Sequence, residues 1–130
     1  MKIMVGLDET TVSQKILDVA KMHAKAFGAD VELVISMETG DEEDQERIKR
    51  AEEDLEKKKK VLESQKIRCN THLLIRGLTP GEDLVQFAKE KDVEEVIVGV
   101  RRKSKVGKLV FGSTAQYVIL HAHCPVVSVK

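Results

Sequence analysis

The sequence predicts an α/β fold of the doubly wound type, built on an open parallel sheet. Five short apolar runs alternate with stretches of helical periodicity along the 130 residues. Some runs, such as Val96–Val98, are continuously apolar, which is typical of strands covered on both faces. No repeat or low-complexity tract interrupts this order. We therefore expect one domain, spanning residues 1–130.

The predicted strands are short, apolar and often β-branched. They are Lys2–Leu7, Val31–Met37, Asn70–Ile75, Glu95–Gly99 and Pro125–Val129. Strands that alternate with helices are joined by right-handed crossovers, so the sheet is expected to be parallel.

Four helices are predicted between these strands. The first has N-cap candidates at Thr10, Thr11 and Ser13 and a stop at Gly28. The second covers about Asp41 to Ser64 and is the most polar. The third begins near Pro80, and the fourth runs from about Ser113 to His121.

Composition excludes several classes of protein. The chain has 22 basic and 22 acidic residues, whereas a phosphate-neutralising nucleic-acid module carries a basic excess. Aromatic residues make up only 3%, which argues against a base-stacking surface. Cys69 and Cys124 are too few for a disulfide framework, and no membrane span or signal peptide is evident. We expect a soluble, cytoplasmic protein with neither nucleic acid nor membrane as partner.

The segment from Gly99 to Gly112 is the strongest candidate for a binding site. It is long for an α/β connection, and Ser113 and Thr114 follow it at a helix start. Free amides and the positive end of a helix, next to basic residues, are the ingredients of an anion site. The alternative is a solvated basic loop whose glycines serve tight turns. The basic residues are Arg101, Arg102, Lys103, Lys105 and Lys108.

Other chemistry is sparse. His121, His123 and Cys124 lie close together, but no second ligand cluster accompanies them, and we predict no metal site. No nucleophile, base and orienting group can be assembled, so no catalytic residue is predicted.

These features together resemble the universal stress protein family along the whole chain. The family opens with a strand that ends in Asp and a small polar turn, as in KIMVGLDETTVS. It carries a G-x2-G-x9-G-[S/T] signature, matched here by Gly99, nine residues from Lys103 to Phe111, and Gly112-Ser113. The ending LHAHCPV is similar to the family's last helix and strand.

The resemblance implies an open five-stranded parallel sheet of order 3-2-1-4-5. The fold would be a Rossmann-like three-layer sandwich, similar to the adenine nucleotide alpha hydrolases. Some members bind ATP where the first and fourth strands meet. The implied ligand is ATP or another adenine nucleotide, with Mg as a candidate metal ion.

The implied roles of individual residues follow from the same resemblance. Asp8 and Gly99 would hold the ribose, and Gly6, Met37 and Val98 would surround the base. Gly112, Ser113 and Thr114 would hold phosphates. The second signature glycine is Arg102 in this chain, which would be strained in a turn that needs a positive φ but adds a charged donor.

Two functions are consistent with these features. The first is a stress-response domain that binds an adenine nucleotide without rapid turnover. The alternative is a nucleotide-free dimeric protein for interaction or signalling. In either case we expect a homodimer through the last strand, where Val126, Val127 and Val129 would lie on an uncovered sheet edge.

Overall fold

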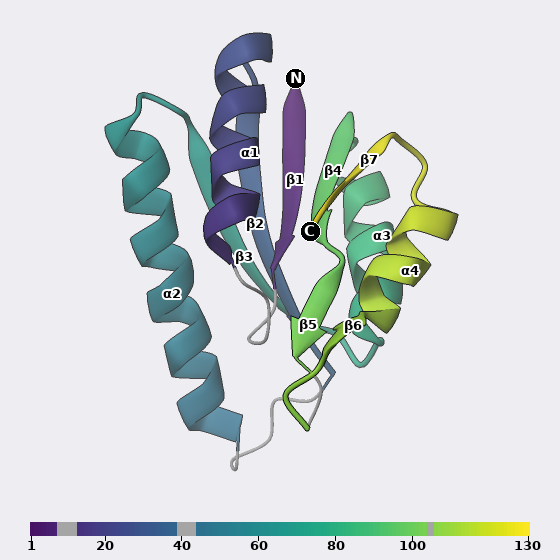
Figure 1. The fold of residues 1–130 in the computed structure, drawn as a ribbon. Coiled ribbons are helices and arrows are strands. Elements are labelled where there is room, and N and C mark those ends of the chain that lie inside the picture. The colour runs from purple at the N-terminus through teal and green to yellow at the C-terminus, as the bar shows by residue number, and fades with distance from the viewer. Residues whose placement is uncertain (8–12, 39–43, 104–105) are drawn as a thin grey trace.

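The computed structural model describes residues 1–7, 13–38, 44–103 and 106–130. Its centre is a five-stranded sheet of order β3-β2-β1-β4-β7, in which every pairing is parallel (Figure 1). Because β7 is the fifth strand of this sheet along the chain, the predicted order 3-2-1-4-5 is confirmed. The strands are β1 (Lys2–Leu7), β2 (Asp30–Met37), β3 (Cys69–Ile75), β4 (Glu95–Gly99) and β7 (Val126–Val129).

Helices cover both faces of the sheet and make three layers (Figure 1). Helices α1 (Ser13–Phe27) and α2 (Gln45–Ser64) pack on one face, and α3 (Pro80–Glu90) and α4 (Ser113–His121) on the other. Each interface has its own apolar cluster, because side chains of a strand alternate between the two faces. Ile3 and Val5 lie in the first cluster, whereas Met4 lies in the second.

Most predicted boundaries agree with the structure to within one residue. Strands β1 and β4 and helix α4 have the predicted bounds. Helix α2 is described from Gln45, and its predicted start near Asp41 lies outside the described residues. The N-cap candidates Thr10 and Thr11 lie outside the described residues.

Three helices end in the same left-handed turn. A residue one or two positions past each helix end has a positive φ, which is 63° at Gly28, 63° at Lys66 and 51° at Asp92. The next amide then donates to a carbonyl five residues earlier, as in a Schellman motif. These bonds are Ala29 N–H to Ala24 O (2.9 Å), Ile67 N–H to Leu62 O (3.1 Å) and Val93 N–H to Ala88 O (3.1 Å).

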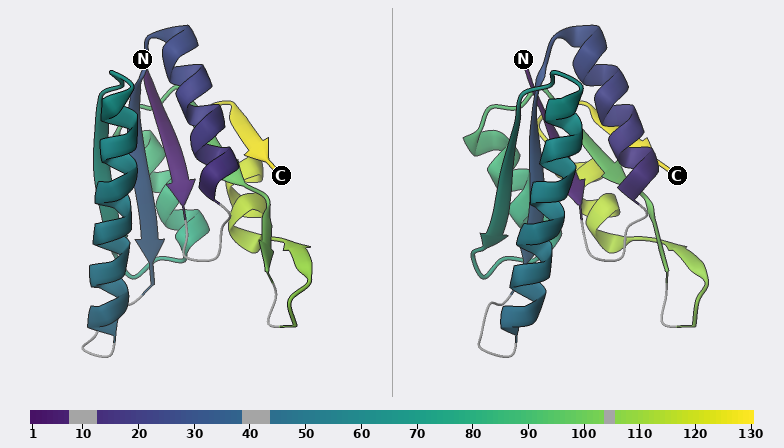
Figure 2. Two further views of the ribbon diagram at one scale, coloured as in Figure 1. Left: turned by 60° about the vertical axis from the view of Figure 1, so that its left-hand side comes forward. Right: turned by 90° about the vertical axis from the view of Figure 1, so that its left-hand side faces the viewer.

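The expected loop between Gly99 and Gly112 contains a β-hairpin that the sequence did not predict. Strands β5 (Arg101–Lys103) and β6 (Leu109–Phe111) pair antiparallel, with Arg102 opposite Val110. Gly107, with a φ of 82°, supplies the left-handed residue near the turn. Both views in Figure 2 show the hairpin extending away from the sheet, at the carboxyl end of β4.

Candidate functional site

The carboxyl ends of β1 and β4 form the switch point of the sheet. Connections leave these two neighbouring strands in opposite directions, and open α/β sheets bind ligands in the crevice that results. Gly6 and Val98 are direct partners across β1 and β4, and Met37 ends the next strand, β2. Asp8, the predicted ribose ligand, lies outside the described residues.

The predicted base-binding residues are largely covered by protein. Met37 is 4% exposed and Val98 is 3% exposed. A Cβ at Gly6 would lie 3.0 Å from Leu84 Cδ1 and 3.3 Å from Val98 Cγ1. The glycine therefore allows α3 to pack closely on β1, and neither large side chain presents an open surface to a ligand.

The root of the hairpin joins β4, β7 and α4 through one residue. The Val100 amide donates to Val129 O (2.9 Å), and the Gly112 amide donates to Val100 O (2.9 Å). Gly112 is the N-cap of α4 and has no side chain with which to cap the first amides of the helix. Ser113 is exposed and Thr114 half-buried at this end. The site can thus offer helix amides and two hydroxyls to an anion, but the Gly112 amide itself is already used.

Arg102 occupies an ordinary strand position in β5. In the described part of the chain, Lys66 and Asp92 are the non-glycine residues with a positive φ, so Arg102 is not one of them. The strain anticipated for an arginine at the second signature glycine therefore does not arise, because the backbone forms a strand here instead of a left-handed turn.

A buried polar network stands beside the switch point and was missed from the sequence. Asp83, in the first turn of α3, is fully buried and accepts hydrogen bonds from Ser36 Oγ (2.7 Å) and Arg76 Nε (2.6 Å). Arg76 also donates to Glu90 Oε2 (2.8 Å), and this bond lowers the pKa of Glu90. The network ties the start of α3 to the carboxyl ends of β2 and β3. The sequence signal for Asp83 was the acidic first turn of this helix, and that signal predicts only a favourable interaction between the carboxylates and the helix dipole.

Two further buried carboxylates are paired with histidine, one on each face of the sheet. Glu95 Oε1 accepts a hydrogen bond from His23 Nδ1 (2.9 Å), and Glu32 Oε2 accepts one from His72 Nε2 (2.7 Å). These contacts give the two histidines a structural role within the fold. Neither pair lies at the carboxyl edge.

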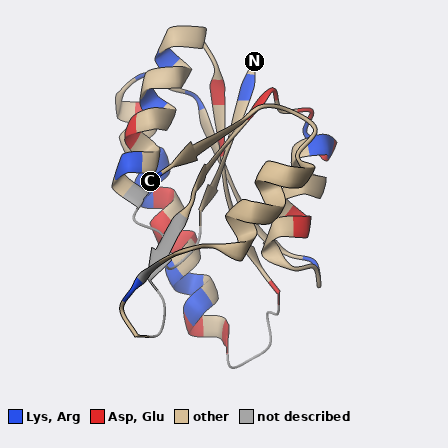
Figure 3. Cartoon of the chain, turned by 45° about the vertical axis from the view of Figure 1, so that its right-hand side comes forward, with Lys and Arg blue, Asp and Glu red and all other residues tan. Residues whose placement is uncertain are grey.

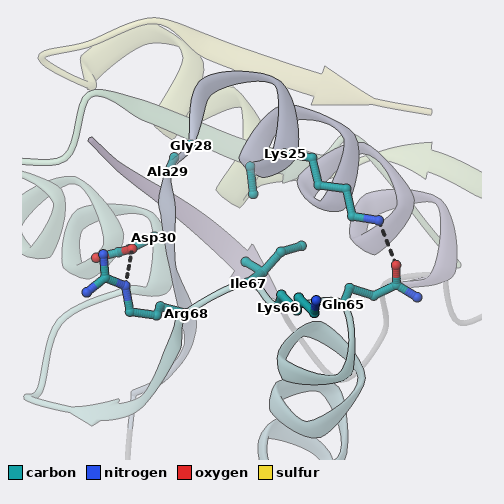
Figure 4. Close-up of a pocket in the computed structure, with 9 residues that line it drawn as sticks. Lys25, Gly28, Ala29, Asp30, Gln65, Lys66, Ile67 and Arg68 are labelled. Atoms are coloured by element: carbon teal, nitrogen blue, oxygen red, sulfur yellow. Dashed lines mark hydrogen bonds and ion pairs between the residues drawn. The ribbon is translucent and has the colours of Figure 1, made fainter.

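A shallow cavity of about 250 Å³ lies at the opposite, amino end of the sheet (Figure 4). Three cations line it, but Lys25 already donates to Gln65 Oε1 (2.7 Å) and Arg68 pairs with Asp30 (3.2 Å). Helices α1 and α2 both end here, so their carbonyl ends face the cations. The cations therefore stabilise the negative ends of the two helices, and the cavity is a poor site for an anion.

The two cysteines are unsuited to reactivity. Burial raises the pKa of the Cys69 thiol to about 12, and burial also raises the pKa of Cys124. Among the residues that the structure describes, no group of three or more His, Cys, Asp or Glu is arranged to hold a metal ion. In the same residues, no helix has the length and apolar character needed to cross a membrane.

Comparison with known proteins gives consistent results. Residues 1–130 match the model of the Universal stress protein family. A universal stress protein from Archaeoglobus fulgidus is 35% identical, with a TM-score of 0.87 over 100% of this chain and 98% of that one. Another structure of a universal stress protein from that organism, in complex with dAMP, is 30% identical, with a TM-score of 0.83 over 100% of this chain and 98% of that one.

A universal stress protein from Methanocaldococcus jannaschii is 35% identical over 79 residues. This match includes 61% of the present chain but only 45% of that protein, so the chain spans less than half of its length.

Proposed function

The chain belongs to the universal stress protein family, and on that premise we propose that it binds an adenine nucleotide at the carboxyl ends of β1 and β4. ATP is the proposed ligand, with Mg²⁺ as its counter-ion. The observation that carries the proposal is the switch point between β1 and β4, with the start of α4 next to it. The relative from Archaeoglobus fulgidus that was solved with dAMP supports the same class of ligand.

The proposed roles follow the order of groups along the edge of the sheet. Asp8 and Gly99 hold the ribose, and the phosphates lie against the first amides of α4 with Ser113 and Thr114. Because Gly6, Met37 and Val98 are covered, the base contacts the backbone at the strand ends rather than these side chains. The sequence offers no nucleophile with a base and an orienting partner, so the proposed nucleotide is held and not rapidly hydrolysed.

Calorimetric titration with ATP tests this proposal. Ser113→Ala and Asp8→Ala are expected to weaken binding, since the first removes a hydroxyl at the phosphates and the second a ribose acceptor. Ser64→Ala is a matched control, because Ser64 is also exposed but lies at the end of α2 and donates to Val61 O. No heat of binding at millimolar ATP, together with no nucleotide in the purified protein by mass spectrometry, would refute the proposal.

The second proposal concerns assembly of the chain into a homodimer. It does not depend on nucleotide binding, so a nucleotide-free interaction protein would keep it. Strand β7 is an edge strand of the sheet. On its inner side, Val96 N–H donates to Pro125 O and Val100 N–H donates to Val129 O. Backbone groups alternate along a strand, so those of Val126 and Ser128 point away from β4. Unpaired edges of this kind favour pairing with a second copy about a twofold axis. We therefore propose a homodimer through β7, built on Val126, Val127 and Val129.

Ser128→Pro tests this edge without altering the core. Proline removes the outward N–H of an exposed edge residue, so we expect a monomer in sedimentation experiments. Ser128→Ala keeps the N–H and should remain dimeric. A monomeric wild-type protein at tens of micromolar would refute the dimer.

A further inference from the structure

The main sheet has two edges, and β3 forms the longer one. Strand β3 has seven residues, whereas β7 at the other edge has four. Its sequence, CNTHLLI, contains no proline and no Lys, Arg, Asp or Glu, the residues that commonly keep an edge strand from pairing. In the right-hand view of Figure 2, β3 lies beside α2, and no described element stands in front of it. The β3 edge is therefore open to an additional strand.

The backbone of β3 presents alternate residues to this open side. Val31 N–H donates to Arg68 O (2.9 Å), which directs the carbonyl of Arg68 toward β2. In the parallel register that follows, Asn70, His72 and Leu74 bond β2, and the residues between them direct their N–H and C=O groups outward. Among the residues that the structure describes, no strand pairs with these outward groups. They belong to Cys69, Thr71, Leu73 and Ile75.

One flank of α2 places acidic residues along this edge. Positions three or four residues apart form a stripe on one side of a helix, and one such stripe of α2 has three carboxylates and one ammonium group. Besides burial, the negative charges of Glu63 and Glu56 raise the pKa of the Cys69 thiol, so this stripe lies next to the beginning of β3. Just past the end of α2, on the side toward α1, Gln65 accepts a hydrogen bond from Lys25 (2.7 Å; Figure 4). We call the stripe the acidic flank; it comprises Glu52, Glu56, Lys59 and Glu63.

The acidic flank extends along most of β3. Helix α2 and strand β3 run in opposite directions, so Glu63 lies near the start of the strand and Glu52 toward its end (Figure 1). The helix rises about 16 Å between these two residues, and a strand of seven residues is about 20 Å long. The three carboxylates are exposed and form no ion pair with a described residue. The α2 side of the β3 edge is therefore negatively charged.

The other face of β3 offers apolar and aromatic groups. The His72 ring lies 4.8 Å from the Phe87 ring of α3, measured between centroids, and its Nε2 donates to the buried Glu32 (2.7 Å). Leu74 packs, partly buried, against the apolar cluster that includes Phe87. Side chains of a strand added at this edge would alternate between the two faces. One set would meet the acidic flank, and the other set would meet His72, Leu74 and Phe87.

A second copy of this chain is a poor occupant of the β3 edge. Pairing of two β3 strands about a twofold axis would place both α2 helices on the same face of the joined sheet. The acidic flanks of the two copies would then face each other, and like charges repel. The β7 edge differs, because α4 packs beside it and has no Lys, Arg, Asp or Glu, as Figure 3 shows. Charge therefore disfavours self-pairing at β3 and favours an occupant of the opposite sign.

We propose that the β3 edge binds an extended segment of another protein in which basic and apolar residues alternate. Its backbone pairs with the outward groups of β3, and its Lys or Arg side chains lie against the acidic flank. The residues between them are apolar and lie against Leu74 and Phe87. In strand addition of this kind, main-chain hydrogen bonds give the affinity and alternate side chains give the specificity. The proposal is independent of the nucleotide site at β1 and β4 and of the dimer at β7.

Fluorescence anisotropy with a labelled peptide tests the charge of the partner. The probe alternates Lys and Val over seven residues, the length of β3, and a peptide that alternates Glu and Val is its control. The Lys peptide should bind at least tenfold more tightly than the Glu peptide. Glu56→Lys combined with Glu63→Lys should weaken binding of the Lys peptide on the order of tenfold, because two attractive pairs become repulsive.

A matched double variant separates the acidic flank from the net charge of the protein. Glu46→Lys combined with Glu53→Lys changes the net charge by the same amount, and both residues are exposed on α2 away from the acidic flank. This control should bind the Lys peptide nearly as well as the wild type does. Melting temperatures of both double variants show that each remains folded.

Hydrogen exchange on the wild-type protein tests the strand pairing without any substitution. The Lys peptide should slow exchange of the Thr71, Leu73 and Ile75 amides, which point outward. The Asn70 amide is already bonded to β2 and should not change. The Ser128 amide, on the other edge of the sheet, should also be unaffected.

Three results would each overturn the proposal. The first is no binding of the Lys peptide at millimolar concentration. The second is an equal loss of binding in the two double variants, which would mean that only the net charge matters. The third is binding without protection of the Thr71 and Leu73 amides, which would place the peptide elsewhere on the protein.

Discussion

Lys66→Gly is expected to make the protein more stable, although it removes a side chain. Lys66 lies two residues past the end of α2 and has a φ of 63°, a conformation that costs an L-residue about 1–2 kcal/mol relative to glycine. Its amide bond to Glu63 O (2.9 Å) and the following bond from Ile67 to Leu62 O (3.1 Å) involve only backbone. Glycine therefore keeps the whole motif and removes the steric cost.

The expected gain is smaller than that cost. A glycine makes the unfolded chain more flexible, which offsets about 0.5–1 kcal/mol. The net increase in the free energy of unfolding is then about 0.5–1 kcal/mol. Asp92→Gly should give less, since aspartate tolerates this conformation better than lysine does. Gly28→Ala should reverse the sign, because the φ there is 63° and nothing lies within 4 Å of an added Cβ, so only backbone strain changes.

Urea unfolding at fixed protein concentration measures these differences as shifts of the midpoint at constant slope. The gain from Lys66→Gly corresponds to a melting-temperature rise of about 2–4 °C. Lys60→Gly is the matched control: Lys60 is exposed inside α2, where glycine lowers stability by about 0.5–1 kcal/mol. If Lys66→Gly and Lys60→Gly destabilise the protein equally, the steric reasoning about the helix end is wrong.

Three other substitutions or treatments test the packing and the ion pairs. Gly81→Ala should lower the melting temperature, because the new Cβ would lie 2.8 Å from Tyr117 Cβ and overpacking costs about 1–3 kcal/mol. An unchanged melting temperature in calorimetry would contradict this close contact. Arg76→Gln should lower stability at pH 7. The difference in stability between Arg76→Gln and the wild type should be smaller at pH 3, because Arg76 lowers the pKa of Glu90 and a carboxylate with a depressed pKa loses its stabilising effect as the pH falls through that pKa. Urea midpoints at pH 7 and pH 3 measure this difference. A larger difference at pH 3 would disprove the reasoning. Cys69, whose pKa is raised to about 12, should resist alkylation by iodoacetamide at pH 8 until urea unfolds the protein. Alkylation of Cys69 in the native protein, detected by peptide mass spectrometry, would contradict this expectation.

The sequence predicted the elements of the main sheet well because they follow simple local rules. Continuous apolar runs such as Val96–Val98 have few alternatives to a buried parallel strand. The order of the strands in the sheet could not be predicted from periodicity, because periodicity does not determine which strands are neighbours. It was predicted from the family resemblance.

The hairpin could not be predicted because its strand β5 consists of Arg101, Arg102 and Lys103. Charged residues have low strand propensity, and the pairing depends on β6 and on the turn at Gly107. The buried position of Asp83 was missed for a related reason. Its partners Ser36 and Arg76 come from two other strand ends, so the network exists only after the sheet has formed.

The proposed nucleotide site and the proposed dimer edge meet at Val100, which gives the two proposals a common physical consequence. Its amide holds the edge strand β7, and its carbonyl holds Gly112 at the start of α4. A phosphate at the first amides of α4 and a second copy on β7 would therefore order the same hairpin root. A ligand that orders this root in advance removes part of the entropy cost of pairing β7 with a second copy. By linkage, nucleotide binding must then tighten the dimer by the same factor by which dimerisation tightens nucleotide binding.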